Sequence, residues 1–67
     1  MNLKQYKYVL TLANEGLFFR AAEELEIKQP SLSQFIKKVE KEIGTELFER
    51  SGGDVRLTDA GYAYIDD

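Results

Sequence analysis

The sequence predicts a small, mainly α-helical domain with a three-helix core, a short β-hairpin and the start of a further helix. Three stretches carry apolar residues at the three- and four-residue spacing of amphipathic helices. Glycine or proline separates these stretches, and a Gly-Gly pair lies between two later short runs. The 67 residues suffice for one domain, and a domain of this size buries roughly 60% of its unfolded surface.

The first helix is expected over residues 2–14. Asn2 is a suitable N-cap because its side-chain oxygen can accept a hydrogen bond from a free N–H of the first turn. Gly16 suits the left-handed position that ends a helix. Tyr8 and Leu12 form a second face, expected either to be buried or lightly exposed, or to contact a second subunit or another helix. The stripe expected to face the core is Leu3, Tyr6, Val9, Leu10 and Ala13.

The second helix is expected from about Phe18 to Leu25. Ala21 and Ala22 face inward, and the small side chain of Ala22 lets the next helix approach closely. Ile27 lies in the following turn, where we expect it to fill the gap between the two helices.

The third helix is expected to run from Pro30 to about Ile43. Proline suits a first turn because its φ is already helical and its missing N–H needs no partner there, and the preceding Gln29 is expected to be extended. Gly44 is expected to end this helix. The apolar stripe is Leu32, Phe35, Ile36, Val39 and Ile43.

A small β-hairpin, the wing, is expected over about residues 46–57, where two short runs flank the Gly-rich turn at residues 51–54. Thr58 is the expected N-cap of a fresh helix. We therefore divide the chain into a domain of residues 1–58 and the start of a linker helix at residues 59–67. That helix is expected to be cut short, because the chain stops within an amphipathic pattern.

This order of elements is that of a winged helix-turn-helix, with the helix-turn-helix at about residues 18–37. Such a motif presents its second helix, the recognition helix, to the DNA major groove. Here that helix is expected over residues 30–43.

Composition excludes several kinds of site. The chain has no Cys and no His, which excludes disulfides, thiol and imidazole catalysis and the usual zinc ligand sets. No apolar run approaches the roughly 20 residues of a membrane span, and the N-terminus lacks the apolar region of a signal peptide. We expect a cytoplasmic protein with no membrane partner, and no metal or cofactor bound by this chain.

Charge is unevenly distributed along the chain. Nine Lys and Arg stand against twelve Asp and Glu, a net charge of −3, which by itself argues against nucleic-acid binding. The segment from Lys28 to Lys41 nevertheless holds four Lys and one Glu. Because local distribution matters more than the sum, this segment remains a candidate DNA surface.

The outer face of the third helix offers amide, hydroxyl and ammonium groups. Gln can bond adenine through N6 and N7, Ser can bond several bases, and Lys can bond guanine or phosphate. Residues near the N-terminal end of a recognition helix reach deepest into the groove. The residues predicted to read bases are Gln29, Pro30, Ser31, Ser33 and Gln34. Those predicted to contact the DNA backbone are Lys28, Lys37, Lys38, Lys41, and the wing residues Arg50 and Arg56.

Two alternatives without DNA binding stay open for these side chains. The helix face could be an ordinary solvated surface, because Lys and Gln are common on exposed helices. The two arginines could pair with Glu46, Glu49 or Asp54.

Two runs carry a resemblance to a known family: Gln29-Pro30-Ser31-Leu32-Ser33 and Gly44-Thr45-Glu46-Leu47-Phe48-Glu49-Arg50. Arg20-Ala21-Ala22 and Val55-Arg56-Leu57-Thr58-Asp59-Ala60-Gly61 extend it. Over about residues 1–61 the chain resembles the DNA-binding domain of LysR-type transcriptional regulators, a winged helix-turn-helix family.

The resemblance implies a bacterial regulator that binds specific double-stranded DNA, with the recognition helix in the major groove and the wing on the flanking backbone. It implies subunits paired through the linker helix into a homodimer or higher homo-oligomer, on half-sites related by two-fold symmetry and roughly 34 Å apart. It also implies a small-molecule effector bound by a C-terminal domain that this chain lacks. Leu17 and Phe19 stand where the family often has Ser or Thr, and Gln34 replaces a frequent Arg, which shifts the expected preference away from guanine.

Other classes of function were weighed against DNA binding. An enzyme is not expected, because adjacent carboxylates such as Glu23 and Glu24 do not share a helical face, and Gly52-Gly53 lacks the Lys and Ser or Thr of a phosphate-binding loop. A protein-interaction module is the second alternative, since a fold does not dictate a function. Salt distinguishes the two, because only DNA binding should weaken steeply as salt rises.

Overall fold

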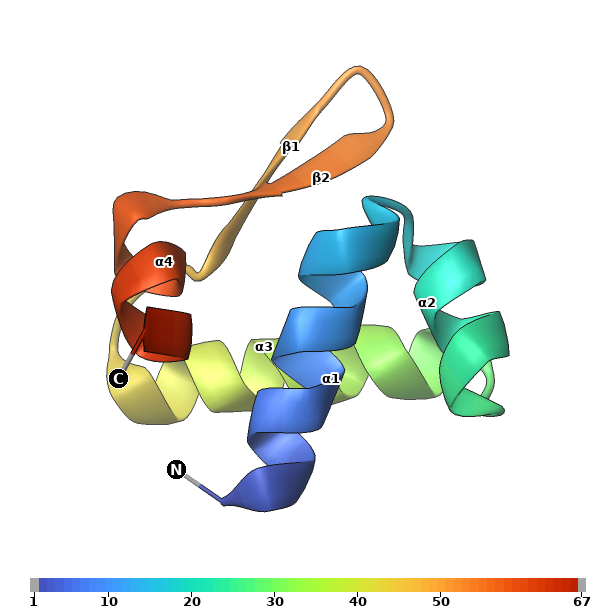
Figure 1. Cartoon of the computed structure of the whole chain (residues 1–67), viewed down its shortest axis with the longest axis horizontal. Helices are drawn as coiled ribbons and strands as arrows, with labels where there is room; N and C mark the ends of the chain where they lie inside the picture. The colour runs from blue at the N-terminus through green and yellow to red at the C-terminus, as the bar shows by residue number, and fades with distance from the viewer. Residues whose placement is uncertain (1, 67) are drawn as a thin grey trace.

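Figure 1 shows the computed structural model, which describes residues 2–66, as three helices topped by a hairpin and a fourth helix. The elements in order are α1 (Leu3–Glu15), α2 (Phe18–Leu25), α3 (Gln29–Ile43), β1 (Phe48–Ser51), β2 (Asp54–Leu57) and α4 (Asp59–Asp66). Helix α1 crosses α3, α2 lies near the start of α3, and α4 packs against α1 and β2. The predicted mainly α, winged helix-turn-helix class is confirmed.

Helix α1 begins and ends as predicted, but the stripe predicted to be buried is only partly correct. The Oδ1 of Asn2 accepts a hydrogen bond from the Gln5 N–H at 2.8 Å, and Gly16 ends the helix with φ of 75°. Val9 and Leu12 are fully buried, whereas Leu3 is 83% exposed. The first turn of α1 extends beyond α3 in Figure 1, so Leu3 has no core to enter.

The second face of α1 is therefore part of the core. Tyr8 packs against Phe35 of α3 with ring centroids 4.4 Å apart, and Leu12 is among the largest fully buried side chains. Of the alternatives for Tyr8 and Leu12, burial within the domain is the one observed.

The helix-turn-helix has a tight connection. Glu26 adopts the left-handed conformation with φ of 59°, and the Ile27 N–H donates to the Ala22 carbonyl at 3.0 Å. Helix α3 starts at Gln29, and the extended residue is the N-cap Lys28, so the prediction that Gln29 is extended was wrong by one residue. Pro30 still falls in the first turn, where its missing N–H costs nothing.

The C-terminal end of α3 also corrects a prediction. Gly44 is the left-handed cap, as expected, with φ of 90°. Ile43 was assigned to the buried stripe, yet it is 43% exposed. The buried stripe is shorter, with Leu32, Ile36 and Val39 inside, because the last turn of α3 runs beyond the core.

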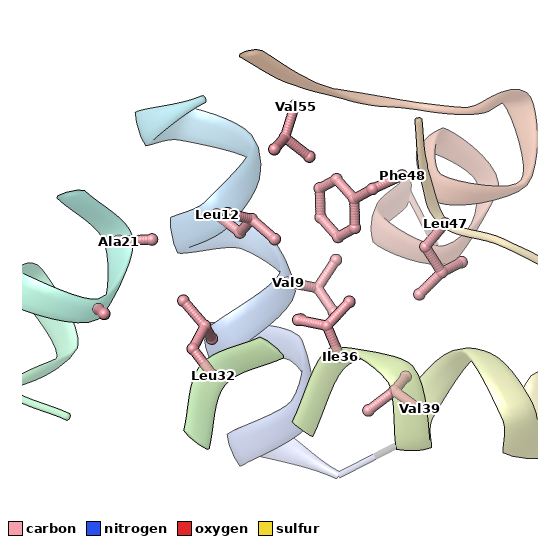
Figure 2. Packing of buried hydrophobic residues seen from close by; sticks show 10 residues of the cluster. Val9, Leu12, Ala21, Leu32, Ile36, Val39, Leu47, Phe48 and Val55 are labelled. Atoms are coloured by element: carbon pink, nitrogen blue, oxygen red, sulfur yellow. The ribbon is translucent and has the colours of Figure 1, made fainter. Parts of the chain in front are cut away.

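The hairpin is held by a two-residue turn. Gly52 and Gly53 both have positive φ, 61° and 96°, the pairing of values that favours glycine at both positions of a hairpin turn. Ser51 pairs with Asp54, and the antiparallel register runs back to Phe48 opposite Leu57. In Figure 2, Phe48 and Val55 extend from the hairpin toward Val9 and Leu12, so the wing closes the same core that the helices form.

Helix α4 starts at the predicted cap. The Gly61 N–H donates to Thr58 Oγ1 at 3.0 Å, and that hydroxyl donates to the Glu46 carbonyl at 2.7 Å. Gly61 is buried in α4. Within residues 2–66, no helix is both long and apolar enough to span a bilayer. The boundary predicted after residue 58 stays a prediction, and residues 1 and 67 lie outside the described part of the chain.

Candidate nucleic-acid interface

The outer face of α3 carries the predicted contact residues. Every predicted base-reading or backbone residue is exposed except Ser33, which is half-buried. With 100° per residue, Pro30, Gln34, Lys37 and Lys41 form one continuous row along the helix. The row is basic toward its C-terminal end and carries the amide of Gln34 toward its N-terminal end.

The two edges of this row face different surroundings. Ser33 and Lys37 line a hollow of about 400 Å³ on the side of the hairpin. The same helical spacing puts Ser31 and Lys38 on the opposite edge of the row. The structure thus divides the predicted contacts of α3 into a hairpin side and a far side.

The hollow is formed by three elements that are distant in sequence. Helix α3 contributes Ser33, Lys37 and Glu40, α2 contributes Phe18, and strand β1 contributes Arg50. Two cations and a hydroxyl therefore share one opening with the carboxylates of Glu40 and Glu46, beside the exposed row of α3.

The wing arginines lie on opposite faces of the hairpin. Arg50 stands directly opposite the buried Val55 in the strand register, so its side chain projects from the inner face of the hairpin. Its guanidinium carbon lies 4.5 Å from the centroid of the Phe18 ring. Such a cation–π contact is worth about 0.5–1 kcal/mol at an exposed site. Arg56 instead stands directly opposite Glu49 on the outer face, where opposite charges attract across the strands. The structure brings Arg50 to the hollow and leaves Arg56 outside it.

Glu40 is a residue of this site that was not predicted from sequence. Its Oε2 accepts hydrogen bonds from the backbone N–H groups of Leu47, at 2.7 Å, and Phe48, at 3.2 Å. These bonds hold the last residue before β1 and the first residue of that strand, which starts at Phe48. The one sequence feature that could have pointed to it is that Glu40 is the single acid between Lys28 and Lys41.

Both helices of the motif start without a side-chain cap. Leu17 occupies the N-cap position of α2 and Lys28 that of α3, and neither side chain accepts a hydrogen bond from a first-turn N–H. Free N–H groups at a helix start favour an anion nearby. Phe19, in the first turn of α2, is 54% exposed. Within residues 2–66, no three acidic, His or Cys side chains are grouped to hold a metal.

Comparisons with known proteins agree with this architecture. Residues 3–62 match the family model described as bacterial regulatory helix-turn-helix protein, lysR family. The regulator BudR of Klebsiella aerogenes is 48% identical over 67 residues, which is all of this chain and 47% of BudR. The uncharacterized regulator YcgK of Bacillus subtilis is 48% identical over 66 residues, 98% of this chain and 20% of YcgK. The chain thus spans less than half the length of these relatives.

Solved structures of DNA-binding domains resemble this chain as well. The crystal structure of the CbnR DNA-binding domain in complex with DNA superposes with a TM-score of 0.90 at 34% identity, covering 100% of this chain and 77% of that one. The complex of the BenM DNA-binding domain with the benA site 1 DNA has a TM-score of 0.90 at 35% identity, covering 98% of this chain and 77% of that one.

Proposed function

Because it belongs to the LysR family of bacterial regulatory helix-turn-helix proteins, this chain is a DNA-binding domain of a transcriptional regulator and not an enzyme, and we propose how it contacts its operator. Helix α3 enters the major groove with its exposed row facing the base edges. The hairpin lies on the flanking backbone. Individual side chains of α3 and of the hairpin make these contacts with the DNA.

The exposed row of α3 is the observation that carries the proposal. Its first turns offer amides and hydroxyls, which discriminate bases, and its later turns offer ammonium groups, which suit phosphates. We assign base reading to Gln29, Pro30, Ser31, Ser33 and Gln34. We assign phosphates to Lys28, Lys37, Lys38 and Lys41. Gln34 favours adenine, because an amide can donate to N7 and accept from N6.

Two neighbours support DNA as the partner, since the CbnR and BenM domains were crystallised with DNA. With α3 in the major groove, the hairpin would lie beside one strand of the duplex. Arg50 would then reach the phosphate nearest to Ser33 and Lys37, because all three face one hollow. Arg56 would reach a different phosphate, on the outer side of the wing, against the pull of Glu49.

The whole regulator is expected to do more than this chain can. We propose that two copies pair through an extended α4 and place their recognition helices on two-fold related half-sites roughly 34 Å apart. A small-molecule effector would bind outside this chain, in the part of the relatives that it does not span. The bacterial cytoplasm, where the chromosome lies, is the expected compartment.

Selection from a randomised duplex library tests the proposal. The expected result is enrichment of sequences that share one base pattern, with an affinity that falls steeply as salt rises. A folded protein that enriches no pattern at low salt would refute sequence-specific binding. Binding of a protein partner through Leu17 and Phe19, unaffected by salt, would favour the alternative of an interaction module.

A further inference from the structure

We infer that Glu40 is a positioning residue for DNA binding, which fixes the wing against the recognition helix through its bonds to Leu47 and Phe48. The inference rests on the proposed function, because it concerns how the wing reaches the backbone. It runs against simple electrostatics. A carboxylate beside a DNA surface should repel phosphates, so removing it should strengthen binding.

The position of Glu40 on α3 supports the inference. Ser33, Lys37 and Glu40 follow one another at four and three residues, so they share the side of α3 that faces the hairpin. One carboxylate therefore sits in line with two of the proposed contacts. Any shift of the chain that it holds would change the distance between the hairpin and these two side chains.

The bonds of Glu40 hold the chain at the start of β1. Leu47 is fully buried and Phe48 is 6% exposed, and their N–H groups donate to one oxygen of Glu40 at 2.7 and 3.2 Å. A hydrogen bond to a charged acceptor is stronger than one between neutral groups, and a buried N–H left without a partner is costly. The Glu40 carboxylate thus fixes the start of β1 relative to α3.

The same peptide is fastened on its other side as well. The Leu47 carbonyl accepts from the Thr58 N–H at 3.0 Å, and the Glu40 carbonyl accepts from Gly44 at 2.8 Å and from Thr45 at 3.2 Å. The base of the hairpin is therefore fixed from both ends, by α3 before β1 and by the start of α4 after β2. Loss of the Glu40 carboxylate frees the end nearest to the recognition helix.

Arg50 is the side chain through which Glu40 would act. It lies two residues after Phe48 on the same inner face of the strand, over the ring of Phe18 and in the hollow that Glu40 lines. If the start of β1 shifts, the guanidinium moves away from Lys37 and from a phosphate bound between them. Glu40 would therefore contribute to affinity without touching DNA.

Glu42 provides a matched control on the same helix. It is exposed, and its Oε1 accepts from the Gln5 side chain at 3.2 Å, away from the hairpin. Glu40→Ala and Glu42→Ala each remove one negative charge, so electrostatics alone predicts a gain in affinity for both, and a larger gain for Glu40, which lines the hollow. Positioning predicts opposite signs.

The experiment measures affinity against salt for the 67-residue chain on a duplex enriched from the library. The expected result for Glu40→Ala is a loss of roughly five- to ten-fold at about 0.1 M salt and a salt slope smaller by about one, the contribution of one phosphate contact. Glu42→Ala should bind as tightly as the wild type or more tightly. Glu40→Gln, which keeps an acceptor oxygen, should recover part of the loss.

Combination with Arg50→Ala separates positioning from a general effect on the fold. Once Arg50 is removed, Glu40→Ala should cause little further loss, because the two changes remove the same contact. Circular dichroism at the assay temperature checks that each variant is folded, and if Glu40→Ala does not fold, Glu40→Gln replaces it in the cycle. Affinity equal to or above the wild type for the Glu40 variants, or losses that add in the double variant, would overturn the inference. A wild-type chain that binds no duplex would instead refute the proposed function.

Discussion

Substitution of Gly61 by alanine should destabilise the domain, although alanine is the better helix former. Gly61 is buried in α4, directly against the segment that leads into the hairpin. A Cβ placed there would lie 2.7 Å from Cδ2 of Leu57 and 3.2 Å from the carbonyl carbon of Leu47, and still nearer to the Leu47 oxygen. The Leu57 side chain can move, but the Leu47 peptide is held by Glu40 and Thr58.

The magnitude follows from two opposing terms. Alanine in a helix is favoured over glycine by about 0.8–1 kcal/mol. Insertion of a methyl group into a closely packed site costs about 1–3 kcal/mol, and more where the neighbour is backbone that cannot move aside. The net expectation is a loss of about 2 kcal/mol from the free energy of unfolding. For a domain of 60–100 residues that is a fall in Tm of roughly 8–16 °C.

Urea and thermal unfolding followed by circular dichroism measure this loss. The matched control is Ala63→Gly at an exposed position of the same helix, which should cost only the propensity difference of about 0.8–1 kcal/mol. A Gly61→Ala variant as stable as the wild type, or more stable, would show that α4 does not pack against Leu47 in solution.

Other expected outcomes concern DNA contacts and pH. Gln34→Ala should cost about 1–3 kcal/mol of binding free energy on the selected site and relax the preference at one base pair. Lys38→Ala should instead weaken binding to all duplexes alike and lower the salt slope by about one. Library selection and salt titration distinguish the two, and equal losses on every sequence would exclude base reading by Gln34. Tyr64→Phe should stabilise the domain by about 1 kcal/mol, because the Tyr64 hydroxyl oxygen is buried with no hydrogen-bond partner among the described residues. Burial, with a smaller contribution from Glu42, raises the pKa of that hydroxyl above its ordinary 10.0. The unfolded chain therefore loses the proton first, so wild-type stability should fall as the pH rises past 10; urea midpoints that fall equally in Tyr64→Phe would contradict this.

The parts of the fold that could be predicted from sequence are those set by neighbouring residues. Asn2 caps α1 through Gln5, three residues away, and the Gly52-Gly53 turn needs positive φ at both positions. Thr58 caps α4 for the same local reason. Each of these features is decided within one turn of chain, so no knowledge of the tertiary structure was needed.

The errors occurred where distant elements decide. The buried face of α1 depends on where α3 crosses it, so Leu3, which was predicted to face the core, is exposed, whereas Leu12, whose surroundings the sequence leaves open, is fully buried. In the same way, the exposure of Ile43 depends on how far α3 extends past the core. Periodicity identifies a helix and its apolar residues, but it cannot say which part of the stripe has a partner.

The candidate DNA interface likewise has features that local sequence could predict and features that depend on distant parts of the chain. The exposure of Gln34 and Lys37 followed from the helical wheel, because α3 uses its opposite side for the core. The separate surroundings of Arg50 and Arg56 required the strand register, which no local rule fixed beforehand. The bonds of Glu40 required the return of the chain seven and eight residues later.

The acidic balance of the chain limits how much a single copy can gain from phosphates. The predicted backbone contacts comprise four lysines and two arginines, and at roughly 0.9 per neutralised phosphate even their full use gives a salt slope near −5. Arg56 faces Glu49, and the hollow that holds Arg50 and Lys37 also contains carboxylates of Glu40 and Glu46. The affinity of one copy for arbitrary DNA should therefore be modest. On the proposed pairing, base reading and a second copy on the same duplex would supply the additional affinity, because both add contacts without requiring more positive charge on this face.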